Sequence, residues 1–284
     1  MKIKSDNNEK HEIRPGQSIE LLKELHILTR DGKMNQDSRR KLKQVYHLYQ
    51  FIEPLLQQVQ KDHANVSLVD HGAGKSYLGF ILYDLFFKAL NDDGKSHIYG
   101  IETRDELVQR SRELAIKLNF LGMSFLNLSV ADSTSSTELP EKIDIVTALH
   151  ACNTATDDAI EFALKKKAKY MVLVPCCQAE VAAELRKAKA DSVRDNPLSE
   201  MWRHPIHTRE FGSQITNVLR CLQLEAHGYQ VKVTELVGWE HSMKNELIVA
   251  EYQGLPAKRP ALRLAEILKT TGLENLSGRF FLPQ

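Results

Sequence analysis

The sequence lacks the features that mark secreted, metal-binding or membrane-spanning proteins. Its 284 residues include four cysteines, with no C-x-x-C pair and no cysteine and histidine at zinc-ligand spacing. This pattern excludes a disulfide framework and predicts that no metal is bound. No apolar run reaches membrane-spanning length, and residues 1–10 lack the apolar core of a signal peptide. We therefore predict a protein of the reducing cytoplasm.

The chain also lacks a strong overall charge. Its formal net charge is +1, so no global field attracts nucleic acid, and any such partner would need a local basic patch. A chain of this length can bury one large core, or one domain with an appendage.

The most informative stretch is residues 66–76, which read Val-Ser-Leu-Val-Asp-His-Gly-Ala-Gly-Lys-Ser. The apolar residues predict a buried strand, the glycines a sharp turn, and the spacing from Tyr77 onward a helix. Such a unit brings backbone N–H groups and a helix N-terminus close to a ligand, and glycine permits that approach.

Three ligand classes use turns of this kind. A phosphate-binding P-loop would need glycine where Val69 stands, and a dinucleotide fingerprint would need glycine where Tyr77 stands. An acid two residues before G-x-G, here Asp70, resembles motif I of the Rossmann-like S-adenosylmethionine (SAM) methyltransferases, although Ser76 replaces the third glycine. SAM is cationic, so a carboxylate beside the turn favours its binding.

This resemblance implies a set of cofactor contacts. Glu102 and Thr103 follow a predicted strand at 97–101, and an acid there can accept hydrogen bonds from both ribose hydroxyls or simply favour a helix dipole. Asp132, after Ala131, follows the next strand and would meet the adenine amino group, or only shape a turn. The predicted SAM contacts are Asp70, His71, Gly72, Ala73, Gly74, Glu102, Thr103, Ala131, Asp132 and His150.

The remaining pattern predicts the fold. We expect strands at 143–150 and 170–174 and an antiparallel ending at 229–236 and 245–252. Early helices should run over 18–30 and from residue 37 or 38 toward 61. Pro54 should bend or divide the second of these helices. The prediction is an α/β, Rossmann-like class I SAM methyltransferase with a mostly parallel seven-stranded sheet. Its parts would be an N-terminal helical extension (1–60), the SAM-binding domain (61–253), and a C-terminal linker and helix (254–284).

Candidate catalytic residues follow the fourth and fifth strands, because ligands bind at the carboxyl ends of parallel strands. Asp157 or His150 could accept a proton, Asn153 could orient an amino group, and Cys152 lies between them in the chain. Asp157 could also only cap a helix. Cys176 and Cys177 could line the substrate pocket or be small buried apolar side chains.

Candidate substrate contacts lie elsewhere in the chain. Arg39 and Lys43 belong to a basic helix start, which could bind phosphates or be a solvated face. Residues 195–213 form a predicted long polar loop in which Trp202 could stack on a planar ring or anchor the loop. Lys75 and Lys244 could contact substrate or form structural pairs.

Four stretches together resemble the Methyltransferase-32 domain proteins and the tRNA 2′-O-methyltransferases that act on the acceptor stem. They are residues 70–75, 150–157 (His-Ala-Cys-Asn-Thr-Ala-Thr-Asp), 175–177 (Pro-Cys-Cys) and 244–245 (Lys-Asn). Asn153 stands where the family has glycine, and the cysteine/histidine zinc segments of the tRNA enzymes are missing. The resemblance implies SAM-dependent methylation, with RNA the leading acceptor. The alternatives are a protein or small-molecule acceptor, a SAM-binding module without turnover, and a P-loop-like hydrolase.

Overall fold

The computed structural model describes residues 13–90, 95–149, 153–175, 178–188, 197–236 and 246–283, apart from the side chains of Asp37, Val130 and Ala131. The chain divides into two compact units. One comprises Met1–Ser129 with Leu236–His241, and the other comprises Val130–Glu235 with Ser242–Gln284. Each unit has its own strands and its own buried apolar side chains.

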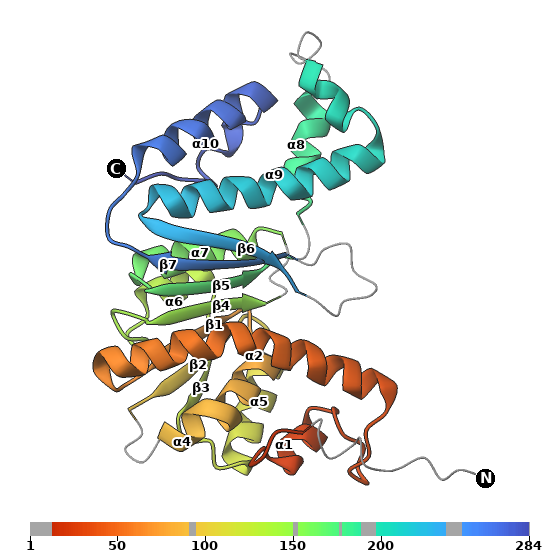
Figure 1. Cartoon of the computed structure of the whole chain (residues 1–284), viewed down its shortest axis with the longest axis vertical. Coiled ribbons are helices and arrows are strands. Elements are labelled where there is room, and N and C mark those ends of the chain that lie inside the picture. The colour runs from red at the N-terminus through yellow and green to blue at the C-terminus, as the bar shows by residue number, and fades with distance from the viewer. Residues whose placement is uncertain are drawn as a thin grey trace, which may run out of the picture. The chain divides into compact units, whose positions relative to one another are not determined.

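The first unit begins with helices and continues with alternating strands and helices. Its described elements are α1 (Ile19–Glu24), α2 (Gln36–His63), β1 (Ser67–His71), α3 (Tyr77–Leu82), the π-helical turn η2 (Tyr83–Phe87), α4 (Lys88–Leu90), β2 (His97–Glu102), α5 (Asp105–Lys117) and β3 (Met123–Asn127). The long orange helix of Figure 1 is α2.

The second unit carries the other strands and a helical layer. Its described elements are α6 (Val130–Ser135), β4 (Ile145–Leu149), α7 (Ala155–Lys165), β5 (Tyr170–Val174), α8 (Glu180–Ala188), the 3₁₀ helix η3 (Pro197–Trp202), α9 (Pro205–Ala226), β6 (Tyr229–Glu235), β7 (Glu246–Tyr252), α10 (Lys258–Thr271) and the 3₁₀ helix η4 (Glu274–Leu276).

Within the described residues, the strands form one seven-stranded sheet in the order β3-β2-β1-β4-β5-β7-β6. In the first unit β2 pairs in parallel with β1 and β3. In the second unit β4 and β5 are parallel, and β7 pairs antiparallel with both β5 and β6. The predicted Rossmann-like class I methyltransferase fold, mostly parallel with an antiparallel ending, is therefore confirmed.

The N-terminal helices differ in detail from the predicted ones. The Ser18 side chain caps α1 by accepting a hydrogen bond from the Leu21 amide, as predicted. However, α1 is shorter than 18–30, because the chain leaves the helical conformation after Leu25 and His26 has a φ of 53°. Pro54 lies inside a continuous α2 rather than dividing it. The side chains of Ile52 and Leu56 on either side of Pro54 are fully buried, so packing favours continuation of the helix.

A π-helical turn interrupts the helix that follows β1. The sequence predicts one helix from Tyr77 to Leu90, whereas η2 inserts wider turns between α3 and α4. Asp84 in this turn is buried and accepts a hydrogen bond from the Ser18 amide at 2.8 Å. The insertion thereby connects the start of α1 to the helix beside the glycine turn.

The expectation of a long polar loop at 195–213 is wrong. The described part of that stretch forms η3 and the first turns of α9, which begins at Pro205. Proline is favoured in the first helical turn, and the Thr208 hydroxyl donates to the Trp202 carbonyl oxygen at 2.7 Å. The exposed polar side chains Arg209 and Glu210 lie on the solvated side of this amphipathic helix. The loop prediction was wrong because it overlooked the 3.6-residue spacing of the apolar residues in α9.

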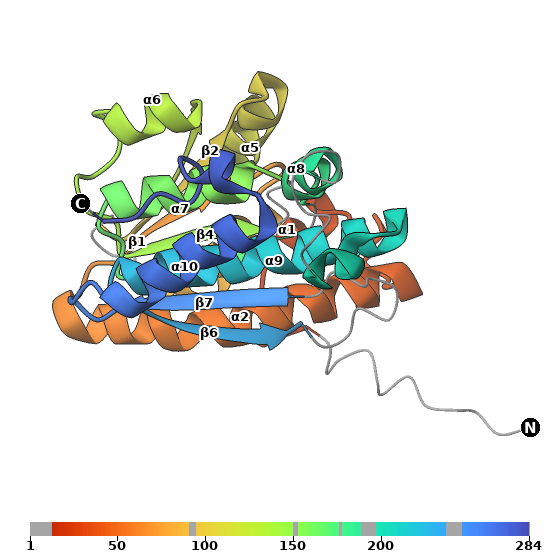
Figure 2. The same cartoon turned by 90° about the horizontal axis from the view of Figure 1, so that it is seen from above.

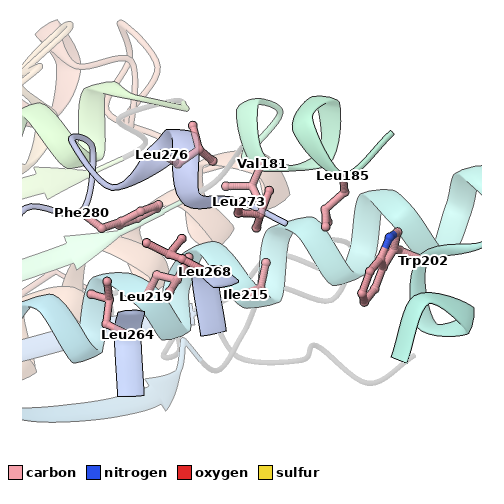
Figure 3. Close-up of a cluster of buried hydrophobic side chains, with 10 residues drawn as sticks. All are labelled: Val181, Leu185, Trp202, Ile215, Leu219, Leu264, Leu268, Leu273, Leu276 and Phe280. Atoms are coloured by element: carbon pink, nitrogen blue, oxygen red, sulfur yellow. The ribbon is translucent and has the colours of Figure 1, made fainter. Parts of the chain in front are cut away.

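An apolar cluster joins the C-terminal segment to the helical layer of the second unit (Figure 3). In Figures 1 and 2, α10 runs alongside α9. The buried members are Val181, Leu185, Trp202, Ile215, Leu219, Leu264, Leu268, Leu273, Leu276 and Phe280. The segment after residue 254 thus packs on this unit, while the proposed domain boundaries themselves remain a prediction. Among the helices described, none combines the length and hydropathy needed to span a membrane.

We predict that Leu268→Ala destabilises the protein by about 2–5 kcal/mol, because it opens a cavity between α9 and α10. Leu268 is 3% exposed, whereas Leu262 on the same helix is 72% exposed. Leu262→Ala is therefore the matched control and should change stability by less than about 0.5 kcal/mol. Urea unfolding of both variants measures the difference, and equal effects would show that α10 is not part of the core.

Candidate functional site

The turn after β1 has the backbone conformation that its glycines permit. Gly72 and Gly74 have φ values of 70° and 58°, in the left-handed region. Among the residues that the structure describes, leaving aside the two chain neighbours of Gly72, no atom lies within 4 Å of the position that a Cβ would take on Gly72. Ser76, at the position of the third motif glycine, also has a positive φ of 49°. Ser76 therefore takes a left-handed conformation that a glycine would adopt more easily.

The structure brings Glu102, at the end of β2, to this turn. Its Oε2 accepts a hydrogen bond from the Gly74 amide at 2.8 Å. Its Oε1 accepts from the Arg104 backbone amide at 3.0 Å and from Arg104 Nε at 3.1 Å. Burial raises the pKa of Glu102, but the hydrogen bonds from Arg104 and Gly74 outweigh this effect and lower it. The result is an ionised carboxylate held on the turn.

Asp70 and His71 lie at the end of β1 and are both buried. Burial lowers the pKa of His71 to about 4, although the nearby charge of Glu102 acts in the opposite direction. The His71 imidazole is therefore neutral at physiological pH. The Ser76 hydroxyl lies 3.5 Å from Asp70 Oδ2, at the outer limit of a hydrogen bond.

The other predicted cofactor and turn residues are more exposed. Thr103 is exposed beside Glu102, and Asp132 is exposed in the first turn of α6. Lys75 is exposed as well, and lines a hollow of about 330 Å³ together with Tyr77, Arg110 and Lys117. Ala73 is half-buried in the turn.

In the second unit, Asp157 and Asn153 are held by a residue that the sequence analysis missed. Arg220 of α9 donates from Nε to Asp157 Oδ1 at 2.7 Å and from Nη2 to Asp157 Oδ2 at 2.8 Å. Both side chains are buried, with 1% and 5% exposure. Because both carboxylate oxygens accept from one guanidinium, this geometry favours a structural role for Asp157 over that of general base. No local motif marks Arg220, since its partner lies 63 residues away.

Asn153, which stands where the family has glycine, takes a backbone conformation that glycine readily adopts. Its φ of 54° is left-handed, a conformation that asparagine tolerates better than most side chains. Its Oδ1 accepts hydrogen bonds from the Ala179 and Glu180 amides at 3.0 and 3.1 Å. The side chain thus caps the start of α8.

The C-terminal segment contacts the same two helix starts. Arg279 lies 3.5 Å from Asp158 on α7 and 3.3 Å from Glu180 on α8. Burial raises the pKa of Asp158, although the charge of Arg279 opposes this shift.

One predicted substrate contact is wrong. Trp202 is 0% exposed and stacks on Phe211, with ring centroids 4.9 Å apart, inside the apolar cluster of Figure 3. A buried indole has no free face for a substrate ring. Arg39 and Lys43 lie in the first turns of α2, as predicted.

Several predicted site residues lie outside the described residues. They are His150, Cys152, Cys176, Cys177 and Lys244, and the side chain of Ala131 is likewise not described. Within the described ranges, no three His, Cys, Asp or Glu side chains gather as a metal site would require.

The burial of neutral His71 predicts a pH-dependent stability. The pKa rises from about 4 in the folded chain toward its ordinary value of 6.5 on unfolding, so the unfolded chain binds more protons between these values. His71 should therefore contribute no pH dependence above about pH 6.5, and should remove roughly 2–3 kcal/mol of stability as the pH falls to about 4.5.

Urea unfolding of the wild-type protein and His71→Gln at pH 7.5 and 4.5 tests this contribution. The variant should lose less stability over that interval than the wild type. An unchanged pH dependence would show that the histidine titrates normally. A His63→Gln variant serves as the control, because His63 is exposed at the end of α2.

Similar proteins were found by sequence and by structure. A Xenopus laevis glutathione S-transferase C-terminal domain-containing protein is 22% identical over 200 residues, which cover 64% of this chain and 30% of that protein. The match thus spans under a third of that relative's length. The magnesium protoporphyrin IX methyltransferase of Synechocystis PCC 6803, solved with bound SAH, has a TM-score of 0.45 and 14% identity, covering 82% of this chain and 94% of that chain. An rRNA methylase from Streptococcus thermophilus has a TM-score of 0.40 and 11% identity, covering 66% and 87%.

The family comparison covers a central part of the chain. The family model Methyltransf_32, described as a methyltransferase domain, matches residues 40–184. This stretch includes the glycine turn, Glu102 and the segment of Asn153 and Asp157, and amounts to just over half of the 284 residues. The chain therefore belongs to this methyltransferase-domain family, that of SAM-dependent methyltransferases.

Proposed function

We propose that this methyltransferase transfers the SAM methyl group to RNA, and that the turn of residues 70–74 with Glu102 holds the donor. The observation that carries the RNA acceptor is a local excess of positive charge at α1 and α2. Residues 23–43 contain seven Lys or Arg and three Asp or Glu, whereas the whole chain has a net charge of +1. Phosphate binding depends on such clusters of Lys and Arg.

The geometry of this segment suits a phosphate backbone. Lys23 and Arg30 line a hollow of about 510 Å³ with Asn35 and Ser38, at the start of α2. Arg40 and Lys43 are exposed in the first two turns of that helix. The resemblance to tRNA 2′-O-methyltransferases supports the same acceptor class. The proposal extends to RNA, either tRNA or rRNA, and not to the acceptor stem in particular.

The residues of the turn fit SAM. Gly72 leaves room for a ligand at the backbone, and the ionised Glu102 offers acceptor oxygens to ribose hydroxyls. Those hydroxyls would replace the Arg104 side chain on Glu102, at little cost because that side chain is 62% exposed and can bind water instead. The neutral His71 adds no positive charge that would repel a cationic donor.

The chemistry of transfer is divided between the donor and the chain. The sulfonium of SAM supplies an activated methyl group, so the protein mainly aligns donor and acceptor. A hydroxyl acceptor also needs a base, and His150 remains the predicted one, because Asp157 is engaged by Arg220. Cys152, Cys176, Cys177 and Lys244 remain predicted pocket residues.

The proposed donor site predicts that Glu102→Ala weakens SAM binding by about 10- to 100-fold, the loss expected for hydrogen bonds to a charged group. Isothermal titration with SAM measures the dissociation constant. Glu106→Ala is the control, because Glu106 is an exposed acid in the first turn of α5. If both variants bound SAM as the wild type does, the carboxylate of Glu102 would not contact the donor.

The proposed acceptor is tested with tritiated SAM and separate pools of RNA, protein and small molecules from cells. Label in RNA would support the proposal, whereas label in protein or small molecules alone would refute the RNA acceptor. SAM binding without label in any pool would indicate a module that binds SAM without turnover.

The basic start of α2 predicts a specific salt effect. Lys43→Ala should weaken RNA binding and reduce the slope of log affinity against log salt by roughly 0.7–0.9, the loss of one phosphate contact. Lys61→Ala is the matched control, since Lys61 is exposed in the last turn of the same helix. Equal slopes for both variants and the wild type would place the RNA elsewhere.

A further inference from the structure

One face of α9 carries a stripe of buried or half-buried polar side chains. Ser213, Asn217 and Arg220 are spaced four and three residues apart, which places them in line on a helix. Asn217 is 4% exposed and Arg220 is 1% exposed. We call this set the α9 polar stripe.

Asn217 links several segments of the second unit. Its Oδ1 accepts from Gln178 Nε2 at 3.2 Å and from Arg220 Nη1 at 3.1 Å. Its Nδ2 donates to Glu246 Oε2 at 2.7 Å. The Ser213 hydroxyl donates to Gln178 Oε1 at 2.6 Å, which completes the stripe's contact with that glutamine.

Arg220 extends the same network to a further segment. Besides its two bonds to Asp157, its Nη2 donates to the Asn153 backbone oxygen at 2.9 Å. Asn153 in turn caps α8 through the Ala179 and Glu180 amides. The α9 polar stripe is therefore hydrogen-bonded to Asn153 and Asp157, to Gln178 and to Glu246.

These three places adjoin the three motif stretches of the second unit. Asn153 and Asp157 belong to the stretch 150–157, Gln178 follows Pro-Cys-Cys, and Glu246 follows Lys-Asn. The three stretches lie far apart in the chain, and the α9 polar stripe is bonded to a residue in or next to each of them.

Stability alone does not account for this arrangement. Burying a guanidinium, a carboxylate and two amides carries a desolvation cost, and well-packed apolar residues often match or exceed the stability of such networks. A fully bonded network does fix geometry, because each donor and acceptor has few alternative partners. Fixed geometry is what methyl transfer needs from the protein.

We propose that the α9 polar stripe is a positioning device for methyl transfer, with Asn217 and Arg220 as positioning residues that fix Asn153, Asp157, Gln178 and Glu246. These four residues lie in or next to the motif stretches in the sequence. This inference rests on the proposed methyltransferase activity. Neither residue is a catalytic residue, since each acts through Asn153, Asp157, Gln178 or Glu246.

The test begins with Asn217→Ala, which breaks three hydrogen bonds but leaves the Asp157–Arg220 pair. We expect kcat to fall by about 10- to 100-fold, as for a displaced reacting group, while the KM for SAM changes by less than about 3-fold. Gln214→Ala is the matched control, because Gln214 is an exposed amide on the same helix. A wild-type kcat for Asn217→Ala would overturn the proposal.

An exchange of side chains separates positioning from folding. Asn217→Asp places a carboxylate against Glu246 and should lose activity. Adding Glu246→Gln restores a donor and an acceptor in swapped positions, so kcat should return to within about 3-fold of the wild type. If the double variant folds with the wild-type melting temperature but stays inactive, the hydrogen bonds are not what sets the rate. If Asn217→Ala does not fold, the comparison of Asn217→Asp with the Asn217→Asp/Glu246→Gln double variant still tests the proposal.

A readout without any acceptor distinguishes failure of this inference from failure of the proposed function. In Asn217→Ala, amide hydrogen exchange at Ala179 and Glu180 should accelerate by about 10-fold or more, while exchange in β1 and β2 stays unchanged. If the wild type methylates nothing but this acceleration is seen, the proposed function fails and the positioning network stands. Unchanged exchange at Ala179 and Glu180 would refute the network's role.

Discussion

The hydrogen bond from the Gly74 amide to the Glu102 carboxylate is the contact on which the proposed donor site depends. It joins the end of β2 to the turn after β1, across 28 residues of chain. Without it, the turn and the acidic side chain would be two separate features of neighbouring strands. With it, an ionised carboxylate is fixed beside a backbone that has room for a ligand. The parallel pairing of β1 and β2 makes this possible, because it sets both strand ends at one edge.

In the second unit a carboxylate is held by a buried ion pair instead of by a backbone amide. Asp157 and Arg220 lie almost wholly out of solvent, where either charge alone would be costly. Their bidentate geometry and the bonds to Asn153 and Asn217 satisfy most of the guanidinium's donors. A backbone amide thus fixes the carboxylate at the glycine turn, whereas a charged side chain fixes the carboxylate at the start of α7.

The sequence alone predicts the features that depend on local or periodic residue patterns. Strand alternation, the turn of residues 70–74 and the antiparallel ending are local or periodic patterns, and the structure has them in the expected order. The role of Arg220 could not be predicted, because its partners are fixed only once α9 lies beside α7 and β7. Of the two roles predicted for Trp202, substrate stacking was wrong and anchoring was right, because an indole in a polar stretch suggests a binding surface until the helix that buries it is seen. The π-helical turn at Asp84 also has no local signature.

The ion pairs of Arg279 mean that the tail of the chain is not a passive extension. Asp158 and Glu180 stand at the starts of α7 and α8, and Arg279 supplies positive charge to both. The same tail contributes Leu273, Leu276 and Phe280 to the apolar cluster that also contains Ile215 and Leu219 of α9. Loss of residues 273–280 would therefore remove the ion pairs of Asp158 and Glu180 with Arg279 and expose part of the apolar face of α9 to water.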